Sequence, residues 1–165
     1  MIFQADMFEG EPDIVRWRRL ASEGHSICEC CGVRMKVYRR KINSGMARTL
    51  VIMHRESRRL NRKWLHHTDD LPRACRASRE MDKLMHFSFV EPRLNEDIKA
   101  RSRSGFWKLT ESGKAFASAQ TKAPSHVFIQ SPGGRILGFE ETQTTIYSAL
   151  GKKFNYFELM AGIDI

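Results

Sequence analysis

The sequence lacks long apolar runs, has little proline and has most of its few cysteines in one place. No apolar run approaches the roughly 20 residues that cross a bilayer, and residues 1–19 lack the basic start, apolar stretch and cleavage site of a secretory signal. Three of the 4 cysteines lie within Cys28–Cys31, a spacing that does not suit a disulfide framework and is common for metal binding in a reducing compartment. With no repeat or low-complexity segment either, we expect a folded cytoplasmic protein.

Acidic residues are scarce in the middle of the chain. Residues 34–108 contain 20 lysines and arginines against 8 acidic residues, whereas the two flanks together contain 8 against 11. The net charge of +9 is therefore confined to the middle of the chain. Because lysine and arginine release condensed counterions when they contact phosphates, this distribution indicates a polyanionic partner. A basic surface that only aids solubility would explain the net charge but not its confinement.

The same region carries helical patterns. Apolar residues recur every three to four positions and predict a helix from about Asn43 to Arg59, with arginines on its opposite face. Asp69 and Asp70 are candidate caps for a short second helix with Pro72 in its first turn. A third helix is predicted to follow a cap at Ser78, with two acidic residues, Glu80 and Asp82, in its first turn and with Met81, Leu84 and Met85 facing the core.

The spacing changes after the third helix. Phe87 and Phe89 alternate as in a strand, and residues 106–109 alternate again after a basic connection. Thr110 is then a candidate cap for a helix through Phe116. This order, helix-turn-helix, strand, basic connection, returning strand and capped helix, is how a winged helix is built.

We therefore predict an α+β fold in three parts. An N-terminal arm and cysteine knuckle occupy residues 1–37, with Arg39, Arg40 and Lys41 as a basic approach to the first helix. A winged helix-turn-helix core occupies residues 38–120, and a C-terminal β-hairpin and helix appendage occupies residues 121–165. In the appendage, Ser131-Pro132-Gly133-Gly134 separates two apolar segments, which is a hairpin signal, and a helix is expected from about Thr142 to Leu150.

Residues 71–116 resemble the winged-helix superfamily, in which a run like Leu109-Thr110-Glu111-Ser112-Gly113 commonly follows the wing. Segments such as Cys28-Glu29-Cys30-Cys31-Gly32, residues 37–48 and residues 77–84 are also similar to segments of small, largely uncharacterised proteins of tailed bacteriophages. The resemblance covers roughly residues 26–160. It departs at Ser88, where the superfamily often has a glycine.

The winged-helix interpretation gives a set of nucleic-acid-binding candidates. The third helix is thin enough for a major groove, its outward positions can reach phosphates or base edges, and the wing lies along the backbone or minor groove. The alternative is that these basic residues form only the solvated face of a protein-docking module. The candidates are Arg76, Ser78, Arg79, Lys83, His86, Arg93, Lys99, Arg101, Arg103 and Lys108.

Cys28 and Cys31 have the ligand spacing of a zinc knuckle, and Gly32 would let backbone N–H groups approach the thiolates. A tetrahedral zinc needs two further ligands, and the candidates, His25, Cys30, Cys75, His54, His66 and His67, form no second pair of this spacing. A dimer could close the site, or the knuckle could survive without metal as packing. If zinc is bound, we expect it to be structural.

We expect no enzymatic activity. His66 and His67 beside Asp69 and Asp70 could suggest a metal-dependent nuclease, but adjacent histidines point to different sides of most backbones, and the two acids serve better as helix caps. The glycines at 133 and 134 are followed by no Lys-Ser/Thr pair and by no helix, so they do not form a phosphate cradle.

Two functions follow from the sequence. The first is a phage-encoded transcription regulator that binds double-stranded DNA, and a homodimer would suit paired half-sites. The second is a phage-encoded interaction protein that modulates or inhibits a host complex, such as RNA polymerase, a nuclease or a defence system. In both cases the protein would act in the cytoplasm of the host cell.

Overall fold

The computed structural model describes residues 26–27, 34–76, 80–94, 104–131 and 134–163. In these ranges the protein is α+β, with three small antiparallel sheets and helices of 4 to 16 residues. None of the described helices has the length and apolar character needed to cross a membrane. The predicted N-terminal arm and most of the cysteine knuckle lie outside the described residues.

The described chain falls into two units. Unit 1 contains residues up to 41 together with residues 126–141, and unit 2 contains residues 42–125 together with residues 142–165. The two units therefore meet after residues 41, 125 and 141, whereas the predicted domain boundaries were after residues 37 and 120. The reason is that the strand before residue 42 pairs with a strand that begins at residue 126.

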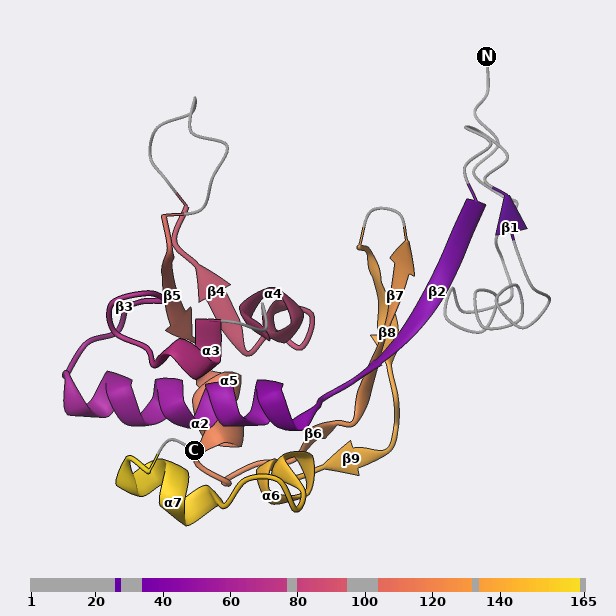
Figure 1. Cartoon of the computed structure of the whole chain (residues 1–165). Helices are drawn as coiled ribbons and strands as arrows, with labels where there is room; N and C mark the ends of the chain where they lie inside the picture. The colour runs from indigo at the N-terminus through magenta and orange to yellow at the C-terminus, as the bar shows by residue number, and fades with distance from the viewer. Residues whose placement is uncertain (1–25, 28–33, 77–79, 95–103, 132–133, 164–165) are drawn as a thin grey trace. The chain divides into compact units, whose positions relative to one another are not determined.

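Unit 1 is a four-stranded antiparallel sheet in the order β1-β2-β7-β8 (Figure 1). Its strands are β1 (Ser26–Ile27), β2 (Arg34–Lys41), β7 (His126–Ser131) and β8 (Ile136–Phe139). The hairpin of β7 and β8 confirms the predicted one. Residues 39–41, predicted as a basic approach to the first helix, are the end of the 8-residue strand β2, whose residues 36–41 pair with β7.

The long helix of unit 2 agrees with its prediction. Helix α2 (Ser44–Arg59) begins after Asn43, whose side-chain Oδ1 accepts the backbone N–H of Met46 at 2.8 Å. Asn43 thereby satisfies one of the N–H groups that a helix start leaves unpaired. The apolar face of α2 is fully buried at Met46, Leu50 and Met53, so burial of this face holds the helix in place.

The elements after α2 build a small sheet around two short helices. They are β3 (Leu65–His66), α3 (Arg73–Arg76), α4 (Glu80–Met85), β4 (Val90–Pro92) and β5 (Phe106–Leu109). The sheet order is β3-β5-β4, so β5 is the central strand. Trp107 of β5 is paired with Leu65 on one side and with Pro92 on the other, and its side chain is buried.

Residues 87–89 form a turn between α4 and β4 instead of the predicted strand. Ser88 has a φ of 57°, in the left-handed region that favours glycine. Ser88 adopts this conformation although it is not a glycine. The turn places the ring of Phe89 against the ring of Phe116, with centroids 4.9 Å apart.

Helix α5 (Glu111–Ala117) follows β5 directly. The hydroxyl of Thr110 accepts the N–H of Gly113 at 3.0 Å, which confirms the predicted cap. The backbone N–H of Thr110 also donates to the carbonyl of Phe89 at 3.0 Å. The start of α5 is therefore fastened to the turn before β4.

The rest of unit 2 packs on α2 from the side opposite the three-stranded sheet (Figure 1). It contains a two-stranded sheet of β6 (Ala123–Pro124) and β9 (Gln143–Thr144), then α6 (Ile146–Leu150) and α7 (Tyr156–Ala161). The helix predicted from Thr142 begins at Ile146, because residues 143–144 pair with β6 and Thr145 caps α6 by accepting the N–H of Ser148.

Candidate nucleic-acid interface

Hydrogen bonds close the hairpin of β4 and β5 at the loop end of its strands. The N–H of Arg93 donates to Phe106 O at 2.8 Å, and the hydroxyl of Ser104 donates to Arg93 O at 2.7 Å. Gly105 has a φ of 80°, and a Cβ at this position would lie 2.6 Å from His66 Nε2. Glycine is therefore required where the chain returns to the sheet. The hydrogen bonds of Arg93 also show that the connection between the two strands begins after this residue.

Two predicted nucleic-acid-binding lysines form ion pairs within the fold. Lys83 Nζ in α4 lies 3.2 Å from Glu80 Oε1, and the Glu80 side chain is only 6% exposed. Lys108 Nζ in β5 lies 2.7 Å from Glu91 Oε2 and 5.2 Å from the centroid of the Trp64 ring. Both lysines therefore already have carboxylate partners in the free protein.

The structure describes only some of the other predicted nucleic-acid-binding residues. Arg93 is exposed at the loop end of the hairpin strands, and His86 is half-buried directly after α4. Only one short turn separates α4 from β4. Lys83, His86 and the hairpin therefore follow one another closely along the chain. Arg76 is the last residue of α3. Outside the described residues lie Ser78, Arg79, Lys99, Arg101 and Arg103.

The interpretation of Asp69 and Asp70 as helix caps was wrong. Asp70 Oδ2 accepts the backbone N–H of His66 at 2.7 Å, and Asp70 Oδ1 lies 3.6 Å from Arg62 Nη1. Asp69 Oδ2 lies 2.8 Å from His66 Nδ1. Both carboxylates thus hold the turn after β3, and α3 begins later, at Arg73, with no acidic residue in its first turn.

The proposed zinc ligands Cys28 and Cys31, and the candidates His25 and Cys30, fall outside the described residues. Cys75 in α3 is buried and is not part of a disulfide. Within the described ranges, no group of three or more histidine, cysteine or acidic side chains is arranged to hold a metal ion.

His54 and Arg58 of α2 and Lys114 of α5 form a basic cluster that was not predicted from the sequence. Burial, together with the positive charges of Arg58 and Lys114, lowers the pKa of His54 below its ordinary value of 6.5. Arg58 follows His54 by one helical turn, which the sequence shows. Lys114 comes from α5 and is brought near His54 only by the packing of α5 on α2.

The lowered pKa of His54 predicts that acid destabilises unit 2. Because folding lowers the pKa of His54, the unfolded chain binds this proton more readily, and stability falls as the pH decreases below about 6.5. We expect the melting temperature to decrease between pH 7.5 and pH 5, and His54→Gln to make this decrease smaller. Thermal melts of both proteins across this range test the prediction, and identical pH profiles would contradict it.

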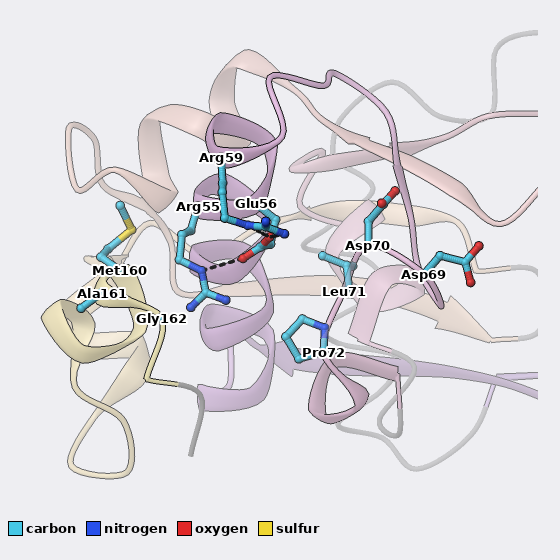
Figure 2. A pocket seen from close by; sticks show the side chains of 10 residues that line it. All are labelled: Arg55, Glu56, Arg59, Asp69, Asp70, Leu71, Pro72, Met160, Ala161 and Gly162. Atoms are coloured by element: carbon cyan, nitrogen blue, oxygen red, sulfur yellow. Dashed lines mark hydrogen bonds and ion pairs between the residues drawn. The ribbon is translucent and has the colours of Figure 1, made fainter.

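A cleft of about 700 Å³ lies between α2, the loop before α3 and the end of α7 (Figure 2). Glu56 lines it, with Oε1 2.8 Å from Arg55 Nε and Oε2 2.6 Å from Arg59 Nη2. Arg55 Nη1 also donates to Leu159 O at 2.6 Å. Arg55 therefore joins α2 to α7, and the charges of Arg55, Glu56 and Arg59 are already paired within the fold.

Comparisons with known protein families, with curated proteins and with solved structures found no match to this chain.

Proposed function

We propose that unit 2 contains a winged helix-turn-helix that binds double-stranded DNA. The observation that carries this proposal is the topology of the three-stranded sheet. Strand β3 precedes the helix pair α3 and α4, β4 and β5 form the hairpin after it, and β5 lies between β3 and β4. A winged helix has the same order of elements, with its second helix in the major groove and its wing on the backbone.

The charge distribution supports the same function. The hairpin carries exposed Arg93 at the loop end of its strands, and the connection beyond it contains Lys99, Arg101 and Arg103. To contact DNA, Lys83 must give up its ion pair with Glu80, and Lys108 must give up its ion pair with Glu91. The loss of these pairs reduces the binding free energy that each lysine gains from a phosphate. We therefore expect affinity to depend more on the connection than on these two lysines.

The test is binding to random-sequence duplex DNA across a salt series. We expect the double variant Arg101→Ala/Arg103→Ala to lose about tenfold in affinity and to reduce the slope of log K against log salt by about 2, because two phosphate contacts disappear. The matched control is Lys122→Ala/Lys152→Ala, which removes two exposed lysines outside the helix pair and hairpin.

An equal loss in both double variants would mean that only net charge matters, and would contradict an interface on the hairpin. Absence of binding by the unmodified protein at low salt would overturn the proposal altogether.

We further propose that the protein is a phage-encoded transcription regulator, which the resemblance to tailed-phage proteins supports.

The alternative function, binding to a host protein complex, is favoured by the exposed apolar residues of unit 1. Its sheet exposes Tyr38 at 49%, Ile136 at 40% and Phe139 at 43%. Tyr38 and Ile136 are both in register with Ile129 of β7, so they flank one buried residue. Apolar exposure of this kind is more typical of a protein contact than of a phosphate contact.

A further inference from the structure

Three aromatic side chains of α6 and α7 form an exposed cluster, which we call the aromatic face. They are Tyr147 of α6 and Tyr156 and Phe157 of α7, and their ring centroids lie 4.9, 5.5 and 6.4 Å apart. Phe157 is 71% exposed and Tyr147 is 47% exposed. Exposed aromatic residues that stand singly are ordinary, whereas a contiguous group of them typically marks a binding site.

The aromatic face is held in place by the buried side of the same two helices. Ile146 and Leu150 of α6 and Leu159 of α7 are between 0% and 2% exposed, and both helices pack on α2. At the start of α7, Asn155 Oδ1 accepts the N–H of Phe157 at 2.9 Å. The rings therefore stand on fixed helices, and a partner that binds them does not have to order a loop.

A positive charge lies beside the aromatic face. Burial and the neighbouring Tyr147 raise the pKa of Tyr156 above its ordinary value of 10.0, and the charge of Arg58 opposes this rise. Arg58 also belongs to the basic cluster with His54 and Lys114. It therefore joins the basic cluster to the aromatic face and gives this face a cationic border.

Arg58 has no carboxylate partner, unlike its neighbours on α2. Arg55 and Arg59 both pair with Glu56. Arg58 is exposed, and no carboxylate within the described ranges forms an ion pair with it. Glu158, the only carboxylate of α7, lines a small cavity to which none of the three rings contributes. The cationic border is therefore open to an anion from outside the chain.

We propose that the aromatic face binds the unpaired bases of single-stranded nucleic acid. Tyr147 and Phe157 stack on bases, and Arg58 contacts a phosphate. A single strand offers both flat rings and regularly spaced negative charge, which this face complements. In a duplex the faces of the bases are covered by neighbouring bases, so this site is separate from the proposed winged helix-turn-helix. A second copy of the chain fits less well, because pairing two aromatic faces would bring two Arg58 charges together.

The test is fluorescence anisotropy of the full chain with labelled oligothymidylate, a strand that does not pair with itself. An abasic strand of the same length and charge is the second probe. The basic hairpin would attract any phosphate chain, and the abasic strand measures that attraction alone. We expect oligothymidylate to bind at least about fivefold more tightly than the abasic strand, which is the effect of one stacked base.

Phe157→Ala and Tyr147→Ala are each expected to weaken binding of oligothymidylate at least about fivefold, and to leave binding of the abasic strand unchanged. Phe157→Tyr keeps a ring and should bind like the unmodified protein. Arg58→Ala removes one phosphate contact, so it should reduce the slope of log K against log salt by about 0.7 for oligothymidylate. Tyr38→Ala is the matched control, because Tyr38 is 49% exposed but belongs to unit 1.

The proposal is overturned if the two strands bind equally, if neither ring variant weakens binding of oligothymidylate, or if Tyr38→Ala weakens it as much. Equal weakening of duplex binding by Phe157→Ala would also overturn it, because the aromatic face would then belong to the duplex site. A dimer that Phe157→Ala converts to a monomer in sedimentation would assign the face to a second copy instead. Single strand and duplex are measured separately, so failure here is distinct from failure of the winged-helix proposal.

Discussion

Gly113→Ala is expected to destabilise unit 2 by more than about 3 kcal/mol. In an ordinary helix position this change would stabilise by up to about 1 kcal/mol, because alanine has the higher helix propensity. Here a Cβ would lie 2.1 Å from the carbonyl oxygen of Phe89 and 2.9 Å from its carbonyl carbon. Both atoms belong to the backbone, so no side-chain rotation relieves the clash. Either α5 or the turn before β4 must move.

The measurement is urea unfolding of the variant and the unmodified protein, followed by tryptophan fluorescence. Gly45→Ala is the matched control. The atoms nearest to a Cβ at Gly45 are the side-chain ends of Asn43 and Glu80, each at 3.2 Å. A shift of a few tenths of an ångström relieves such a contact, so the effect should be less than about 1 kcal/mol in either direction. Equal unfolding midpoints for the two alanine variants would show that close approach of α5 to Phe89 is not required.

Glu56→Ala is expected to cost about 2–4 kcal/mol of unfolding free energy. Glu56 is 5% exposed, and its two oxygens accept from Arg55 at 2.8 Å and from Arg59 at 2.6 Å. The Arg59 side chain is 63% exposed and can return to water, whereas that of Arg55 is 13% exposed. The variant therefore leaves one largely buried guanidinium with a lost partner, in addition to a cavity beside α2.

Glu111→Ala removes a comparable ion pair at the surface. Glu111 Oε1 lies 2.7 Å from Lys114 Nζ, but the Glu111 side chain is 90% exposed. Water replaces this contact, so we expect an unchanged unfolding midpoint. The same urea titration compares both variants. If the two substitutions have equal effects, burial of Glu56 contributes nothing to the strength of its pairing.

Where the determinants of structure are close in sequence, the sequence predicted the structure well. The start of α2 depends on Asn43 and Met46, three residues apart, and on an apolar face that repeats along one helix. Thr110 caps α5 through Gly113, again three residues away. The α+β class and the hairpin of β7 and β8 follow from equally local patterns.

Where partners are distant in sequence, the predictions failed. The paired part of β2 reads Lys-Val-Tyr-Arg-Arg-Lys and has no clear alternation, and it becomes a strand because β7, about 90 residues later, supplies its backbone partners. Glu80 does lie in the first turn of α4, as predicted, but its burial was not predicted. That burial comes from the packing of α4 beside the start of α2, which no spacing in the sequence indicates.

Backbone hydrogen bonds join the two residues of unit 2 that flank residues 126–141. Ser125 donates its N–H to Thr142 O at 2.8 Å, and Ile42 donates to Ser125 O at 3.1 Å. Residues 126–141 are therefore an insertion into the chain of unit 2, and the ends of this insertion meet. Closing such a segment depends little on its length, so its tip can change through evolution without displacing the helices and strands of the proposed DNA-binding unit.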